Sequence, residues 1–124
     1  RHTRLFVVGH GVVLAAAAAA GWILLPVVFG EGFTDARDVL VVVTAAEAVL
    51  AIHFMHQALL VGFGRPKGIG LPQVVGAVVM VVLVLVMIPT WGIQGAAWAS
   101  LLGYTALAGT STAWTNRELR RIKA

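Results

Sequence analysis

One acidic residue stands well inside an apolar stretch of this chain. Glu47 lies about midway along residues 35–61, a stretch made mostly of Val, Ala and Leu. A charged side chain that faces hydrocarbon costs on the order of several kcal/mol, so such residues usually face a bundle interior or an aqueous cavity. Glu47 is therefore a candidate for proton or cation coupling, or for contact with a transported molecule. The alternative is a structural glutamate, protonated or hydrogen-bonded, that water reaches from outside.

Two histidines and a glutamine follow Glu47 on the same stretch. His53 and His56 are three residues apart, so a helix places them on one face. Zinc sites use three or four ligands and no third one stands nearby, so we expect no metal here. Instead, His53, His56 and Gln57 are predicted to line a polar vestibule. Glu47 and His56 lie nine residues apart, about 180° around a helix, and cannot share a site on one straight face.

Small residues form a second pattern near the C-terminal end. Gly95, Ala99 and Gly103 recur at every fourth position. Such a stripe lets another helix approach closely, and we interpret it as helix packing, with substrate passage as the less favoured alternative. The sequence contains no phosphate-binding loop, nucleophile with its base, or paired carboxylates. We therefore expect neither an enzyme nor a bound cofactor.

Composition defines the elements that must position these residues. Of the 124 residues, 60% are hydrophobic and 11% are charged, and the mean hydropathy is +0.94. A soluble domain averages about 45–50% apolar and about 25% charged residues, and a small one buries only about 60–70% of its unfolded surface. These values exclude an ordinary soluble enzyme, a disordered segment and a nucleic-acid-binding module. The absence of cysteine excludes disulfides and Cys-based metal sites.

Four stretches are long and apolar enough to approach or exceed the length that crosses a bilayer, about 20 helical residues. They cover residues 5–29, 35–61, 71–88 and 95–116. Because open sheet edges are not tolerated in lipid, we expect a helix in each stretch. Pro89 is predicted to end the third helix, residues 90–93 to form a tight turn, and residues 117–124 to form a cytoplasmic tail. The predicted fold is all-α, a single integral-membrane region with four transmembrane helices.

The basic residues predict the orientation, because Lys and Arg accumulate on the cytoplasmic side. Eight of the nine fall on one side of the four predicted spans: Arg1, Arg4, Arg65, Lys67, Arg117, Arg120, Arg121 and Lys123. The opposite side holds Arg37 together with Glu31, Asp35 and Asp38. Both ends of the chain are therefore expected in the cytoplasm.

Three segments carry a family resemblance. They read LLPVVFGEGF at residues 24–33, LLVGFGRPK at residues 59–67 and IPTWGIQGAAWAS at residues 88–100. Together they resemble the C-terminal part of bacterial polysaccharide flippases, the Wzx-type exporters of lipid-linked oligosaccharides in the MOP superfamily, which also holds the MATE multidrug transporters. The third segment is the most specific. It departs mildly from the family pattern, with Trp91 in place of the more usual Phe or Tyr and Ser100 in place of Thr.

The resemblance implies a two-lobed transporter of about twelve or fourteen helices, of which this chain would form the last four, in the C-terminal lobe. The implied cargo is an oligosaccharide on polyprenyl pyrophosphate, moved to the outer face of the bacterial cytoplasmic membrane. The partners are then the bilayer, this lipid-linked oligosaccharide and the remaining helices of the transporter. Arg65 and Lys67 are candidates for attracting the pyrophosphate at the cytoplasmic entrance, although the positive-inside distribution alone accounts for them and is the favoured interpretation.

Two other functions stay open. One is a MATE-type, cation-coupled drug or metabolite antiporter. The other is a stand-alone four-helix membrane protein that assembles partners through the stripe at Gly95, Ala99 and Gly103. Because the sequence starts at Arg1 and not at a methionine, we expect a fragment of a longer protein, which the resemblance places at the C-terminal end.

Overall fold

A computed structural model describes residues 2–33, 36–64 and 68–123 of the chain. Helix α1 spans His2–Phe29, a 3-10 turn η1 spans Glu31–Phe33, α2 spans Ala36–Gly62 and α3 spans Gly70–Lys123. The expected all-α fold is confirmed for this part of the chain, which contains no strand. Three helices are long and apolar enough to cross a membrane, with candidate spans at Val8–Phe29, Ala36–Gly62 and Gly70–Arg121. The length and composition of these helices indicate a membrane protein.

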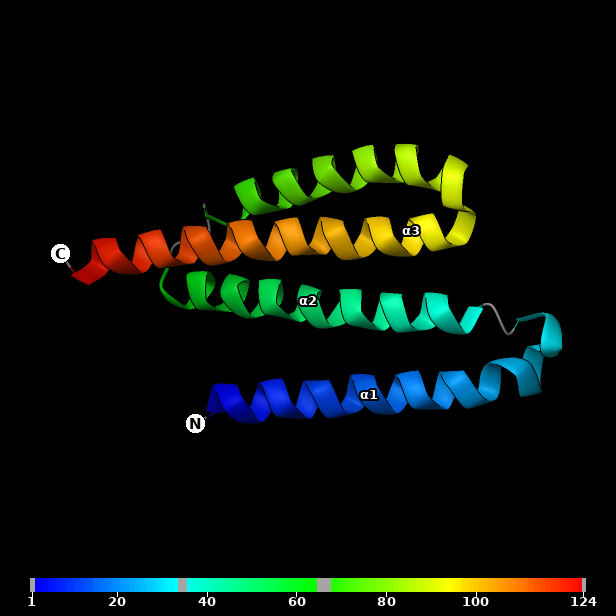
Figure 1. The fold of residues 1–124 in the computed structure, drawn as a ribbon. Helices are drawn as coiled ribbons and strands as arrows, with labels where there is room; N and C mark the ends of the chain where they lie inside the picture. The colour runs from blue at the N-terminus through cyan, green and yellow to red at the C-terminus, as the bar shows by residue number, and fades with distance from the viewer. Residues whose placement is uncertain (1, 34–35, 65–67, 124) are drawn as a thin grey trace.

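Helix α3 reverses direction at Gly92, where the backbone leaves helical geometry with φ 55° and ψ −133°. Figure 1 shows its two parts running side by side in opposite directions. We call residues 70–91 the first arm and residues 93–123 the second arm. The reversal falls within residues 90–93, where the sequence predicted a tight turn, but the helix does not end at Pro89. The helix continues for two residues past Pro89, and one glycine makes the break.

The residues around Gly92 explain how so short a reversal is possible. Proline removes one helical N–H donor, and nearby the Thr90 hydroxyl donates to the carbonyls of Val86 (3.3 Å) and Met87 (3.1 Å). Only glycine readily adopts the Gly92 backbone angles. A Cβ at Gly95 would collide with the backbone carbonyl of Met87, so glycine is also needed where the arms first meet.

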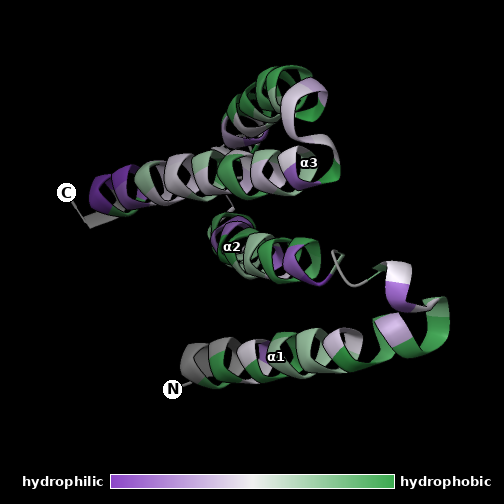
Figure 2. Ribbon diagram, turned by 45° about the vertical axis from the view of Figure 1, so that its right-hand side comes forward, coloured by the Kyte–Doolittle hydropathy of each residue, from purple (hydrophilic) through white to green (hydrophobic). Residues whose placement is uncertain are grey.

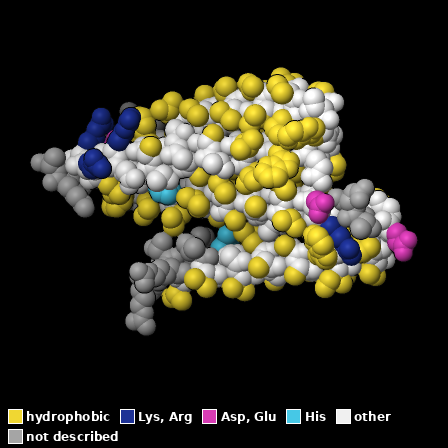
Figure 3. Space-filling view, in the orientation of Figure 1, with side chains coloured by type: hydrophobic (Ala, Val, Ile, Leu, Met, Phe, Trp, Pro, Cys, Tyr) yellow, Lys and Arg dark blue, Asp and Glu magenta, His cyan; other side chains and the backbone are white. Residues whose placement is uncertain are grey.

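The other helix ends differ modestly from the expected ones. Helices α1 and α2 lie within three residues of the predicted bounds 5–29 and 35–61. Residues 117–123, predicted as a tail, continue α3 as helix. The first residues of α1 and the last of α3 lie at the same end of the molecule (Figure 1). Lys and Arg side chains gather at the C-terminal end of α3 (Figure 3). At the opposite end of the molecule, acidic side chains lie beside a further basic side chain.

Helix α2 lies between α1 and the second arm (Figure 1), and its buried residues mark the face toward α3. These are Ala46, His53 and Leu60, which recur at seven-residue intervals. In the second arm, every fourth residue from Ala99 to Thr115 is buried. At Gly76 and Gly103 a Cβ would press on Leu107 and Met80 of the opposite arm. Small residues therefore let α2 and the two arms pack closely.

Helix α1 is attached along one narrow stripe. Its half-buried positions are His10, Leu14, Ala18, Gly21, Leu25 and Pro26, and no described side chain of α1 is buried. Gly21 lies close to α2, because a Cβ there would overlap the side chain of Leu40. Most of α1 is coloured as hydrophobic in Figure 2. Its side chains Val12, Ile23 and Val27 are each more than 60% exposed.

Candidate functional site

The most buried polar contact joins α2 to the second arm. The Nδ1 atom of His53 lies 2.6 Å from the hydroxyl oxygen of Ser111. Both side chains are only 2% exposed. The Ser111 hydroxyl donates its single proton to the carbonyl of Leu107, one turn earlier, at 2.8 Å. Its oxygen is then the acceptor for His53, so the imidazole carries a hydrogen on Nδ1 and presents Nε2 as a hydrogen-bond acceptor when neutral.

A groove of about 270 Å³ lies beside this histidine, between α2 and both arms of α3. Three side chains with hydrogen-bonding atoms line it, one from each helical segment: His53 from α2, Gln73 from the first arm and Tyr104 from the second. The rest of the lining is apolar or glycine: Leu50, Phe54, Gly76, Ala77, Met80, Gly103 and Leu107. Apolar walls with a few convergent polar groups are typical of small-molecule sites.

The structure places Glu47 elsewhere. Its side chain is exposed on a flank of α2, on the same side as Val43 and Phe54, which are also exposed. Among the residues the structure describes, the carboxylate has no hydrogen-bond or ion-pair partner. Glu47 therefore faces outward from the helices that the structure describes, and its coupling or cargo role stays a prediction. Because a carboxylate that faces hydrocarbon is unfavourable, the outward position of Glu47 calls for a polar neighbour beyond the described helices.

The predicted vestibule of His53, His56 and Gln57 is not formed as one cluster. His56 donates from Nδ1 to the backbone carbonyl of Ile52 at 2.7 Å, within its own helix. His53 instead faces α3 and lines the groove. Gln57, one turn after His53, is half-buried. The side chains of His53 and His56 thus serve separate contacts, although they share a helix.

The small-residue stripe is covered within the chain. Ala99 is fully buried, and Gly95 and Gly103 face Met87 and Met80 of the first arm. The stripe therefore lets the two arms of α3 meet, and it is not free as an association face for a stand-alone assembly protein. Arg65 and Lys67, the head-group candidates, lie outside the described residues.

Two contacts escaped the sequence analysis. Pro26 has no N–H, so the carbonyl of Trp22, four residues earlier, has no helical donor. The Nε of Arg37 donates to that carbonyl at 3.0 Å, and its guanidinium carbon lies 5.2 Å from the centre of the Trp22 ring. This contact ties α1 to α2 at the acidic end of the molecule. The position of Pro26 could have indicated the first contact, because it leaves the Trp22 carbonyl in need of another donor. The His53–Ser111 pair had no such signal, because 58 residues separate its partners.

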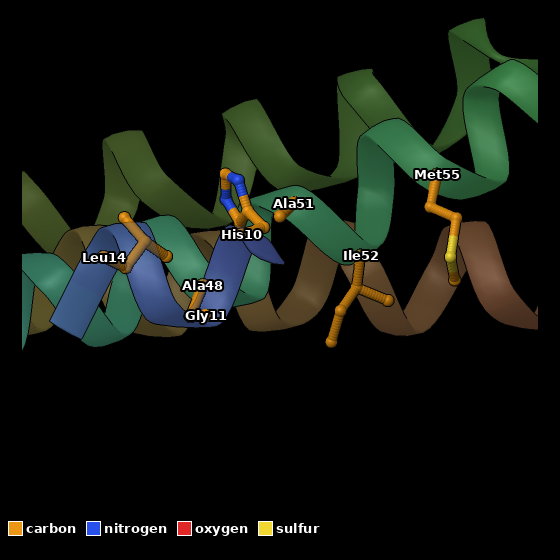
Figure 4. Close-up of a pocket in the computed structure, with 7 residues that line it drawn as sticks. All are labelled: His10, Gly11, Leu14, Ala48, Ala51, Ile52 and Met55. Atoms are coloured by element: carbon orange, nitrogen blue, oxygen red, sulfur yellow. The ribbon is translucent and has the colours of Figure 1, made fainter. Parts of the chain in front are cut away.

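A second groove, of about 200 Å³, runs between α1 and α2 (Figure 4). His10, Gly11 and Leu14 line it from α1, and Ala48, Ala51, Ile52 and Met55 line it from α2. Apart from the His10 ring, these side chains carry no group that recognises a polar ligand. The groove therefore reflects loose packing of small residues between these two helices.

Comparisons of the chain with protein-family models, with curated proteins and with solved structures give no match in any of the three. The geometry of the site and the sequence resemblance are therefore the grounds on which a function is argued.

Proposed function

We propose that this chain is the C-terminal region of a transporter that flips polyprenyl-pyrophosphate-linked oligosaccharides across the bacterial cytoplasmic membrane for surface polysaccharide synthesis. In this proposal, α1, α2 and each arm of α3 cross the bilayer once. The end that carries Arg117, Arg120 and Arg121 faces the cytoplasm, because basic residues accumulate there. The MOP-superfamily resemblance and the distribution of charge support this arrangement.

The observation that carries the proposal is the local structure of residues 88–100, the segment with the most specific resemblance. Two positions in it require glycine for different steric reasons. Gly92 has backbone angles that only glycine readily adopts, and a Cβ at Gly95 would collide with the Met87 carbonyl. A shared spacing of Pro and Gly is more informative when each residue has such a reason, because random apolar helices do not require it. These steric reasons support the resemblance, because they give the spacing of the glycines a role beyond hydrophobic composition.

The exposed features of α1 and α2 give further support. A large transporter supplies additional helices that cover apolar flanks and line a hydrated cavity. Glu47, at mid-span with no described partner, has the character of a residue that completes its contacts outside this chain. In the proposed transporter it remains the coupling or cargo candidate, and His53, His56 and Gln57 remain cavity candidates.

The test is to disrupt the gene for the transporter and to measure where its lipid-linked oligosaccharide accumulates. We expect accumulation on the cytoplasmic face and loss of surface polysaccharide, restored by the wild-type gene. Normal surface polysaccharide together with lost cation-dependent drug efflux would instead identify a MATE-type antiporter. Glu47→Gln then tests coupling. Full polysaccharide export by Glu47→Gln would exclude a coupling role for Glu47.

A further inference from the structure

The groove between α2 and the arms of α3 contains polar groups that the fold leaves without partners. His53 uses Nδ1 to bind Ser111, and its Nε2 has no hydrogen-bond partner among the described residues, although the side chain is 98% buried. The Tyr104 hydroxyl and the Gln73 amide, which line the same groove, also have none within the described part of the chain. His53 is buried, Tyr104 is half-buried and Gln73 is exposed, so their free polar atoms can be reached from the groove. Three hydrogen-bonding side chains, one from each helical segment around one groove, provide the convergent polar groups that ligand sites use.

The chemistry of the lining limits what that group is. None of the described residues around the groove is Lys, Arg, Asp or Glu, so the described lining offers no full charge to balance a phosphate or an amine. Nε2 of neutral His53 accepts a hydrogen bond, while the Tyr104 hydroxyl and the Gln73 amide both donate and accept. A hydroxyl group also donates and accepts, so uncharged hydroxyls match all three side chains.

The position of the groove indicates a molecule that is partly apolar. Gln73 is the fourth residue of α3, near the basic end of the molecule. Tyr104 follows Gly103, which packs against Met80, and Met80 lies about 10 Å further along the first arm than Gln73. Leu50, Met80 and Leu107 supply apolar wall between these levels, and the exposed Phe54 lies at its edge. A molecule that enters from the membrane meets hydrogen-bonding groups and hydrocarbon in the same groove.

We propose that this groove binds the uncharged, hydroxyl-bearing head group of a membrane amphiphile, such as a glycosyl or glycerol group. A hydroxyl of the ligand donates to Nε2 of His53, while Tyr104 and Gln73 bind its remaining hydroxyls. Ser111 is a positioning residue, because it fixes which imidazole nitrogen is free. This site differs from that for the pyrophosphate of the proposed cargo, which is anionic, and it does not depend on the transport function.

The test uses the protein labelled with ¹⁵N-histidine in phosphatidylcholine nanodiscs, with octyl glucoside as the probe at concentrations below micelle formation. We expect a saturable change in the ¹⁵N chemical shift of His53 Nε2, a signal identified by its absence in His53→Phe. Free glucose and phosphatidic acid are the matched probes without a tail and with a charged head group. Neither is expected to produce the shift at the same concentrations.

Variants separate a site from general detergent effects. Tyr104→Phe removes one hydroxyl and is expected to weaken binding about fivefold, the effect of one neutral hydrogen bond. Thr105→Val removes the neighbouring, exposed hydroxyl, which bonds to its own helix at Leu101, and is expected to leave binding unchanged. Gln73→Leu replaces Tyr104→Phe if the latter fails to fold. The proposal is overturned if octyl glucoside produces no saturable shift, as for a groove that holds water only. Equal shifts with glucose or phosphatidic acid, or equal binding by the Tyr104 or Gln73 variant, also overturn it.

Discussion

Helix α1 and the second arm of α3 are both long apolar helices, yet the rest of the chain covers them very differently. The second arm has a buried residue in almost every turn, and it contacts the first arm and α2. No described side chain of α1 is buried, and its main attachments are the approach of Gly21 to Leu40 and the contact of Arg37 with Trp22. We call α2 with the two arms of α3 the α2–α3 unit.

The difference shows what holds apolar helices together when their surroundings are also apolar. Lipid tails are as apolar as leucine, so burial of hydrophobic surface gives little preference for a neighbouring helix over lipid. Close packing of small residues and hydrogen bonds between helices give that preference. The α2–α3 unit has both, in Gly95, Gly103 and the His53–Ser111 pair. Substitutions in it should therefore have larger effects than the same substitutions in α1.

The largest effect is expected where the arms touch through backbone. In Gly95→Ala the new Cβ would meet the Met87 carbonyl, which cannot rotate away as a side chain does. We expect a loss of about 2–3 kcal/mol in unfolding free energy, typical of overpacking. The matched control is Gly109→Ala in the same arm, where nothing lies within 4 Å. It should be neutral or stabilising by up to about 1 kcal/mol, because alanine favours helix. Denaturation in mixed micelles measures both.

Two leucines give the comparison with identical chemistry. Leu60 of α2 is 3% exposed, and Leu24 of α1 is 52% exposed. Leu60→Ala leaves a cavity and should lower the unfolding free energy by about 2 kcal/mol. Leu24→Ala should change it by less than about 0.5 kcal/mol. Equal losses in the same denaturation assay would show that α1 is as firmly packed as the α2–α3 unit.

The His53–Ser111 pair should show a smaller, specific coupling. Ser111→Ala leaves the Nδ1–H of a buried imidazole without an acceptor, and His53→Phe removes the imidazole. Hydrogen bonds between membrane helices contribute about 0.6 kcal/mol on average. A double-mutant cycle should therefore give a coupling energy of about 0.5–1.5 kcal/mol. The control is a second cycle that pairs His53→Phe with Thr112→Val in place of Ser111→Ala. The Thr112 hydroxyl bonds to Ala108 of its own helix, so this cycle should give a coupling energy near zero.

The smallest effect is expected at the attachment of α1. Arg37→Gln removes the donor to Trp22 and should weaken α1 docking by about 0.5–1 kcal/mol, since the contact is exposed. Pro26→Ala restores an N–H that can bond to the same carbonyl. In that background Arg37→Gln should have a smaller effect. Energy transfer between a fluorescent probe on α1 and one on α2 measures docking. If Arg37→Gln weakens docking equally in the Pro26→Ala background, the proposed role of the Trp22 carbonyl is contradicted.

Sequence patterns predicted the local features well. Hydrophobic length located α1 and α2 to within three residues, because helix length in a membrane protein follows the width of the bilayer. The reversal in α3 falls within the predicted turn at residues 90–93, but its exact place was less predictable. Pro89 suggested the end of a helix, whereas Thr90 and Gly92 allow the helix to pass the proline and reverse three residues later. Proline marks a lost donor, but what replaces it depends on neighbouring side chains.

The candidate site depended on information that no local pattern contains. Helical spacing grouped His53 with His56, but packing against the second arm turned His53 toward Ser111 and left His56 on its own helix. Glu47 was predicted to face a bundle interior or an aqueous cavity, and it lies outside the two faces of α2 that meet the described helices, so that prediction concerns surroundings beyond them. The rotation of a helix about its axis is set by all of its neighbours together, so the side that a single polar residue faces cannot be read from its position in the chain.

The most direct test of the proposed four crossings is the accessibility of single cysteines in membranes, since the chain has no cysteine of its own. Phe63→Cys, Trp91→Cys and Asn116→Cys place one label near the end of α2, one at the reversal and one late in the second arm. We predict that an impermeant reagent labels Trp91→Cys from outside, and labels Phe63→Cys and Asn116→Cys only from the cytoplasmic side. Protection of Trp91→Cys with outside labelling of Asn116→Cys would contradict the arrangement, because α3 would then cross the membrane only once.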